Sequence, residues 1–211
     1  MADDVTLGQL RAWVEGFQVL VAAHRGYLTD LDAAIGDADH GTNLDRGLTA
    51  VVTALRESPP GAVDELAKTV AMTLISTVGG ASGPLYGTFF LRFATAAGPV
   101  TTLDVEALAL ALRAGVDGVV ARGHAEPEDK TMVDALSPAI TAFETAAADG
   151  AASACRAAVA AAEAGRDATT PLVARKGRAS YLGERSAGHL DPGAASSALL
   201  VRALADAVAG A

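Results

Sequence analysis

The chain has little of several features that common protein classes require. It contains one cysteine, Cys155, and therefore cannot form an internal disulfide; the alanine-rich setting predicts a packing residue on a helix. The N-terminus carries acidic residues where a secretory signal has basic ones, so we expect a cytoplasmic protein. Aromatic residues make up only 4% of the 211 residues, although apolar residues make up 51%. The composition predicts closely packed helices with a core of alanine, valine and leucine.

Basic residues are also in deficit, because 16 lysines and arginines face 25 acidic residues and the formal net charge is −9. Such a surface repels a phosphate backbone, so nucleic acid is not an expected partner. A small nucleotide is compatible with this charge if a metal ion or backbone amides act locally. Residues 69–91 contain no charge, but Gly79-Gly80 and Gly83-Pro84 interrupt them. We predict two buried helices joined by a loop there, and no membrane span.

Helical periodicity covers most of the chain, and no run of alternating β-branched residues predicts a strand. The first helix is expected to start at Thr6, because Gln9 completes a capping box. The last is expected over residues 192–208, with Asp191 as its cap and Pro192 in its first turn. The other helices are predicted over residues 27–34, 44–55, 62–78, 83–97, 103–122, 131–148 and 151–165. We expect an all-α protein of about eight antiparallel helices, a bundle or barrel forming a single domain over residues 1–211.

Five aspartates lie between positions 30 and 45, and Asp32, Asp37 and Asp39 have no adjacent lysine or arginine. In an extended loop, Asp37 and Asp39 would point to the same side. A hard divalent cation would relieve their repulsion, and oxygen ligands favour Mg²⁺, Ca²⁺ or Mn²⁺ over zinc. The segment lacks the closing glutamate of an EF-hand calcium loop. The alternative is that these aspartates cap helices and form turns, with His40 and Asn43 as ordinary helix-start residues.

The segment GGASGPLYGTFF places glycines just before a helix that is expected to begin near Pro84. Glycine lets the backbone approach an anion closely, and the amides of a helix N-terminus attract it, with Ser82 as a further contact. The segment matches neither the Walker A pattern nor the dinucleotide fingerprint. A tight connection between two buried helices is the alternative.

A third segment, KGRASYLGERSAGHLDPGAASS, is polar and punctuated by glycine. Its candidates are Arg178, Arg185 and the turn of Asp191, Pro192 and Gly193. An arginine fork suits phosphate recognition, and the helix after Asp191 offers further amides. An ordinary surface loop has the same composition.

A fourth segment, RGHAEPEDKTMVDAL, contains Gly123, Lys130 and Met132. Met132 can pack against a purine face. Lys130 can contact phosphate, but a solvated loop lysine is expected instead, because most lysines are exposed.

Together, IGDADHGTNLDRG, GGASGPLYGTFF, DKTMVDAL and GRASYLGERSAGHLDPGA resemble the L subunit family of dihydroxyacetone kinases, in this order and over nearly the whole chain. The resemblance implies an eight-helix barrel that binds ADP or ATP at one end through two magnesium ions. It implies that Asp32, Asp37 and Asp39 are the metal ligands. The nucleotide-binding residues that it implies are His40, Gly41, Thr42, Asn43, Ala81, Ser82, Gly123, Met132, Arg178, Asp191, Pro192 and Gly193.

One branch of this family consumes ATP in a fused chain. The other branch keeps ADP as a resident cofactor, which a phosphotransferase-system donor protein recharges, and dihydroxyacetone is bound by a separate K subunit. The free-standing chain resembles the second branch, in which it positions metal and nucleotide for in-line phosphoryl transfer and supplies no other catalytic residue. Two alternatives stay open: an ATP-consuming kinase subunit for another triose or a carrier-bound fatty acid, and a nucleotide-sensing module that binds a transcriptional regulator.

Overall fold

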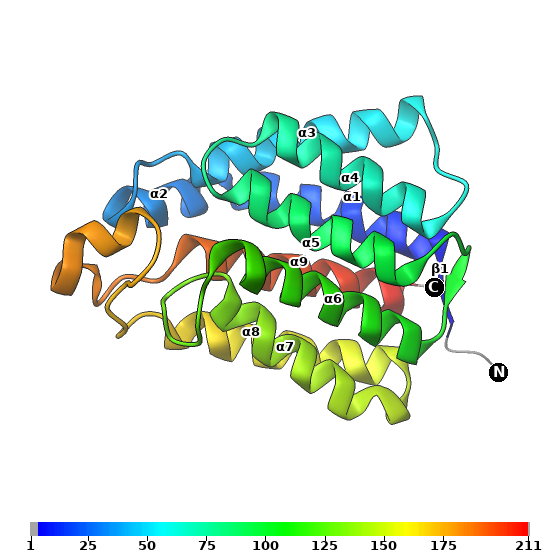
Figure 1. Ribbon diagram of the computed structural model, residues 1–211. Helices are drawn as coiled ribbons and strands as arrows, with labels where there is room; N and C mark the ends of the chain where they lie inside the picture. The colour runs from blue at the N-terminus through cyan, green and yellow to red at the C-terminus, as the bar shows by residue number, and fades with distance from the viewer. Residues whose placement is uncertain (1–3, 211) are drawn as a thin grey trace.

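The computed structural model describes residues 4–210; the first three residues of the acidic N-terminus and Ala211 lie outside this range. The described residues form nine α-helices, two 3₁₀ segments and two short strands (Figure 1). The α-helices are α1 (Leu7–Ala23), α2 (Arg25–Ile35), α3 (His40–Glu57), α4 (Val63–Thr77), α5 (Ser82–Ala97), α6 (Val105–Gly123), α7 (Val133–Ala146), α8 (Ala151–Ala168) and α9 (Pro192–Ala209). The 3₁₀ segments are η1 (Ala147–Asp149) and η2 (Arg178–Ser186), and the strands are β1 (Val5–Thr6) and β2 (Thr102–Leu103).

The predicted all-helical class is confirmed, with two corrections. Residues 4–210 contain nine α-helices, one for each predicted helical range, although about eight helices were expected in all; the helix predicted over residues 27–34 is α2, which begins at Arg25 after the chain turns at His24. In addition, β1 and β2 pair antiparallel with Val5 opposite Leu103, although no sheet was expected. Two residues are too few to give an alternating pattern. Within the same range, every helix is too short or too polar to cross a bilayer.

The helices pack in a cyclic order. Helix α1 lies beside α3, after which α4, α5, α6, α7, α8 and α9 follow as successive neighbours, and α9 returns to α1. Helix α2 lies at one end, where it contacts α3, α9 and η2 (Figure 1). A cluster of buried apolar side chains drawn from all the helices of this ring forms the core.

The few aromatic side chains gather where α1 faces α5. Trp13 packs against Phe89 and Phe90 with ring centroids 6.4 and 5.5 Å apart. Elsewhere small residues permit close contact between helices, and a side chain at Gly165 of α8 would overlap the Asp134 carbonyl of α7. The core thus uses alanine, valine and leucine as the composition predicts.

Local sequence signals are confirmed at both ends of the chain. The Thr6 hydroxyl accepts the Gln9 N–H at 3.2 Å, and the Gln9 side chain accepts the Thr6 N–H at 2.9 Å. Asp191 caps α9 by accepting an N–H of its first turn, and Pro192 opens that helix. Cys155 is buried within α8, as predicted.

Four connections meet at the end of the ring where α2 lies: residues 36–39, 78–81, 124–132 and 169–191 (Figure 1). The non-glycine residues with a left-handed backbone in the described chain, Ala38, His124, Glu128 and Lys130, all belong to these connections. Such conformations cost about 1 kcal/mol or more each and concentrate at functional sites. This end of the molecule is therefore where a site is expected.

Candidate functional site

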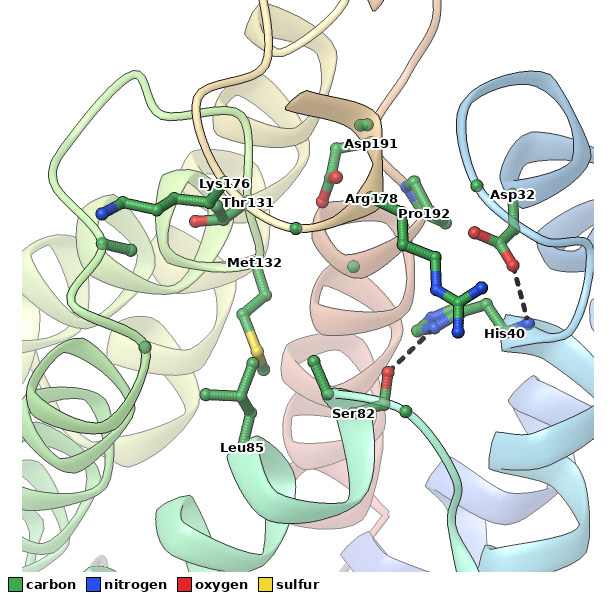
Figure 2. Close-up of a pocket in the computed structure, with 18 of the residues that line it drawn as sticks. Asp32, His40, Ser82, Leu85, Thr131, Met132, Lys176, Arg178, Asp191 and Pro192 are labelled. Atoms are coloured by element: carbon green, nitrogen blue, oxygen red, sulfur yellow. Dashed lines mark hydrogen bonds between the residues drawn. The ribbon is translucent and has the colours of Figure 1, made fainter. Parts of the chain in front are cut away.

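The four connections surround a cavity of about 380 Å³, a size typical of small-molecule sites (Figure 2). The predicted site residues that line it are Asp32, Asp37, Asp39, His40, Asn43, Ala81, Ser82, Gly123, Met132, Arg178, Asp191, Pro192 and Gly193. Gly41 and Thr42 lie in the first turn of α3 outside this lining, and Gly41 is buried against the Arg25 carbonyl of α2. Arg185 is exposed and does not line the cavity.

The three predicted carboxylates converge. One oxygen from each of Asp32, Asp37 and Asp39 lies within 4.8 Å of the other two. Asp32 Oδ2 also accepts the N–H groups of Asp39 at 2.8 Å and His40 at 3.1 Å, so this buried carboxylate satisfies the start of α3. Asp32 therefore has both of the roles considered from the sequence: it binds the amides at a helix start, and it belongs to the carboxylate cluster.

The backbone between the acids is shaped by two small residues. A side chain at Gly36 would overlap the Asp32 carboxylate, so only glycine fits there. Ala38 has a φ of 61°, and the acids on either side of it both join the cluster. A donor set made only of carboxylates suits Mg²⁺, Ca²⁺ or Mn²⁺ better than zinc. The residues present therefore fit a hard divalent cation, which would offset the repulsion between them.

Arg178 reaches this cluster from η2. Its Nη1 atom lies 2.7 Å from Asp37 Oδ2, with 62% of the arginine side chain exposed. Two further basic side chains, Arg122 and Lys176, line the cavity and were missed by the sequence analysis. Each is the first residue of a segment that the sequence analysis singled out, RGHAEPEDKTMVDAL for Arg122 and KGRASYLGERSAGHLDPGAASS for Lys176, and this position was the available signal. The cavity thus combines carboxylates with local positive charge on an acidic protein.

The glycine loop, residues 78–81, leads into α5, which begins at Ser82 and not near Pro84 as predicted. Ser82 Oγ lies 3.1 Å from Nδ1 of His40, and Nε2 of the same ring lies 2.9 Å from Ser196 Oγ (Figure 2 shows the first contact). The Ser196 hydroxyl continues to the Tyr86 hydroxyl at 2.7 Å. A buried chain of hydrogen bonds therefore runs from the cavity into the core.

Burial sets the ionisation of this chain. It lowers the pKa of His40, although Asp32 and Asp39 oppose this by favouring the charged ring. Burial also raises the pKa of Tyr86 to about 12. At neutral pH the imidazole is therefore neutral, so one of its nitrogens donates and the other accepts.

The opposite wall of the cavity is less polar. Met132, which is buried, lies directly above Leu85 in Figure 2, and Gly123 and Thr131 complete this wall. Leu85 was not predicted as a site residue, because a leucine on a buried helix gives no signal of its own. An apolar wall facing a polar one is typical of a pocket for a flat aromatic ring with a charged tail.

The carboxyl group of Asp191, which lines the cavity, has a strongly raised pKa. Burial raises its pKa to about 7, the Ala194 N–H lowers it, Asp134 raises it and Lys130 lowers it. The prediction that Lys130 is solvated is wrong. Its side chain is 1% exposed, and its ammonium group donates to backbone carbonyls of residues 169–191.

Fold and cavity together define an all-helical protein with a pocket at one end of its ring, lined by clustered carboxylates, basic side chains and a glycine loop. The family model described as "DAK2 domain" matches residues 34–206. The chain therefore belongs to the DAK2 domain family.

Individual relatives agree with this family. The chain is 44% identical over 194 residues to "PEP-dependent dihydroxyacetone kinase 1, ADP-binding subunit DhaL" of Listeria innocua, covering 91% of this chain and 92% of the relative. It is 44% identical over 199 residues to the corresponding ADP-binding subunit DhaL of Escherichia coli, covering 93% and 95%. A crystal structure of the dihydroxyacetone kinase from C. freundii in complex with AMP-PNP and Mg²⁺ matches 93% of this chain with a TM-score of 0.71 and 27% identity. The chain spans about a third of that longer kinase, or 33%.

Proposed function

We propose that the chain is the nucleotide-binding subunit of a dihydroxyacetone kinase, which holds ADP or ATP with magnesium in the cavity. The observation that supports this most is the convergence of Asp32, Asp37 and Asp39 to within 4.8 Å in the same cavity as the glycine loop and Ser82. Carboxylates supply hard ligands for magnesium, and the loop amides suit phosphate. Similarity over more than 90% of the chain to two ADP-binding subunits supports the same function.

In this proposal Asp32, Asp37 and Asp39 hold two magnesium ions. Their carboxylates offer six oxygens, and water and phosphate oxygens would complete the coordination, because Mg²⁺ keeps several ligands that are not protein atoms. When bound, magnesium neutralises charge on the phosphate groups during in-line transfer. The role of the chain itself is to hold the nucleotide in the orientation that in-line transfer requires.

The nucleotide is proposed to span the cavity from its polar to its apolar wall. Ala81 and Ser82 at the start of α5 would contact phosphate, and Arg178 would contribute a charge-assisted hydrogen bond. The adenine ring would lie against Met132 and Gly123. The other residues of the proposed nucleotide site are His40, Gly41, Thr42, Asn43, Asp191, Pro192 and Gly193.

The acceptor and the phosphoryl donor are proposed to reside on other proteins. A K subunit would present dihydroxyacetone at the open mouth of the cavity, and a phosphotransferase-system protein would recharge bound ADP. The description of the Listeria innocua and Escherichia coli relatives as subunits of a PEP-dependent kinase supports this division. A transcriptional regulator is the partner in the alternative role, in which the subunit reports its nucleotide state.

Native mass spectrometry of the purified chain, before and after chelation, tests the proposal. We expect retained ADP with magnesium, and loss of both on chelation. Asp37→Asn and Asp39→Asn should each weaken retention, whereas Asp206→Asn, on the exposed side of α9, serves as the matched control. Unchanged nucleotide occupancy in both cluster variants would contradict the metal site. Bound ADP without dihydroxyacetone phosphate, when both partners are added, would favour the regulatory role.

A further inference from the structure

The most unusual buried charge in the molecule is the ammonium group of Lys130, whose side chain is 1% exposed. Its Nζ atom lies 2.5 to 3.3 Å from five backbone carbonyl oxygens, those of Thr169, Thr170, Leu172, Ser186 and His189. The ion pairs found among residues 4–210 do not include Lys130. The Asp191 carboxyl interacts with this ammonium group at longer range, but the direct partners of the ammonium group are carbonyl dipoles. Burial of a charge is costly unless its protons are bonded, and the carbonyl oxygens meet this requirement here.

The five acceptors are distributed over both ends of one segment. Thr169 and Thr170 directly follow α8, whereas His189 lies just before the cap of α9. One ammonium group therefore joins the beginning and the end of residues 169–191. Apart from the 3₁₀ segment η2, this long connection has no regular secondary structure, so internal contacts of this kind help to order it.

This segment contributes to the cavity at two places. Residues 176–179, including Arg178, form one part of its lining, and Asp191, Pro192 and Gly193 form another. Both parts lie inside or next to the loop that Lys130 closes. Arg178, which pairs with Asp37, therefore belongs to the segment whose two ends Lys130 joins.

Lys130 is itself presented by a rigid connection. Asp134, in the first turn of α7, accepts the N–H of Thr131 at 2.7 Å and that of Glu128 at 2.5 Å. Asp129 accepts the Glu126 N–H at 2.8 Å. Lys130 has a φ of 63°, and its neighbours Thr131 and Met132 line the cavity. Lys130 thus links the cavity wall that contains Thr131 and Met132 to residues 169–191.

We propose that Lys130 is a positioning residue of this site: its ammonium group ties the two ends of residues 169–191 together and so holds Arg178 and the Asp191 turn against the cavity. The identity of the ligand rests on the proposed function, whereas the ordering of residues 169–191 by Lys130 is independent of that function.

The choice of lysine agrees with this role. Only three of the 16 basic residues are lysines, at positions 68, 130 and 176. An ammonium group is compact and directs three protons tetrahedrally, whereas the arginine fork is planar and longer. Lys130→Arg is therefore not expected to restore the contacts, although it keeps the charge.

Hydrogen exchange without nucleotide tests the ordering directly. In Lys130→Met we expect faster amide exchange across residues 169–191, with the amides of α1 and α5 still protected. Lys68→Met is the matched control, because that lysine is on α4, is 54% exposed and pairs with Asp64. Unchanged exchange in residues 169–191 of a folded Lys130→Met would overturn the proposal. Loss of helical circular dichroism throughout the chain would also overturn it, because Lys130 would then support the whole fold.

Chemical rescue separates the positioning role from a merely structural one. Lys130→Ala removes the equivalent of propylammonium, so added propylammonium should restore both the exchange protection of residues 169–191 and the binding of magnesium ADP. The neutral isostere 1-propanol should restore neither. We expect at least a tenfold loss of magnesium ADP affinity in Lys130→Ala, measured by calorimetry. Equal rescue by 1-propanol would contradict the proposal, and failure of the wild-type chain to bind magnesium ADP would contradict the proposed function alone.

Discussion

Arg178 Nη1 lies 2.7 Å from Asp37 Oδ2, so the connection that carries η2 is joined across the cavity to one of the three clustered carboxylates. The same guanidinium is proposed to contact nucleotide phosphate, and the same carboxylate is a proposed metal ligand. The arginine should therefore weaken the binding of a metal ion alone, because both interact with Asp37. It should strengthen the binding of a metal–nucleotide complex, because it also contacts the phosphate. These two effects have opposite signs.

Arg178→Gln should therefore change two affinities in opposite directions. Binding of Mn²⁺ alone should tighten about two- to fivefold, because exposed ion pairs contribute at most about 1 kcal/mol. Binding of magnesium ADP should weaken about tenfold or more, since a charge-assisted hydrogen bond contributes about 1.5–3 kcal/mol. Calorimetry measures both. Arg175→Gln is the matched control, because Arg175 is 66% exposed and does not line the cavity. Parallel weakening of both ligands in Arg178→Gln would contradict the competition.

Asp32 and Asp37 should differ in what they contribute to stability. Asp32 accepts two backbone amides at the start of α3, whereas Asp37 pairs with one largely exposed arginine. In chelator, Asp32→Ala should be less stable to urea than Asp37→Ala by about 1–3 kcal/mol, the cost of leaving buried donors unsatisfied. Relief of carboxylate repulsion is common to both variants and cancels in the difference. Equal unfolding midpoints would show that the amides find other partners.

Sequence reasoning succeeded where structure is encoded locally. Thr6 with Gln9 and Asp191 with Pro192 mark helix starts through contacts only a few residues apart. The helix ranges followed from periodicity in the same way, and the aspartate cluster was visible because its members lie close together in the chain. Most residues that line the cavity belong to the four segments that the sequence analysis singled out, although Val119 lies outside them and Leu85, Arg122 and Lys176 were not named as site residues.

Sequence reasoning failed for contacts between residues that are far apart in the chain or that carry no recognisable sequence pattern. Lys130 was expected in solvent, because its acceptors are backbone carbonyls that any residue carries. The pairing of Arg178 with Asp37 depends on two connections far apart in the sequence. The pairing of Val5 with Leu103 involves only two residues per strand. In each case the packing of the helices brings the groups together, and no local pattern records it.

The chain of hydroxyls behind His40 predicts different roles for two adjacent serines. Ser196 and Ser197 are both fully buried on α9, but Ser196 contacts the His40 ring at 2.9 Å, whereas Ser197 contacts only the Tyr86 hydroxyl, at 3.2 Å. Ser196→Ala should weaken magnesium ADP binding about fivefold, because the ring that orients Ser82 loses a hydrogen bond of about 1 kcal/mol. Ser197→Ala should change it less than twofold. Calorimetry on both variants decides this, and equal effects would mean that the ring is held by packing alone.

Asp191 should make stability depend on pH in a defined direction. Its pKa is raised from 3.8 to about 7 by burial, against the opposing Ala194 N–H. Below pH 3.8 the carboxyl is protonated whether the chain is folded or not, and its contribution is fully present. Between pH 3.8 and 7 the folded chain binds more protons than the unfolded chain, so the free energy of unfolding falls as pH rises. Above pH 7 the group is ionised in both states and the contribution stays lost.

Asp191→Asn removes this titration and keeps a side-chain oxygen for the cap of α9. The variant should therefore gain stability relative to the wild type as pH rises from about 4 to 7, by at most about 1.4 kcal/mol per pH unit for one proton, and the difference should then level off. Urea unfolding at unit pH intervals from 4 to 9 measures it. A stability difference that is constant over this range would mean that Asp191 ionises equally in the folded and unfolded chain, so that the charge of Lys130 and the amides of α9 fully offset its burial.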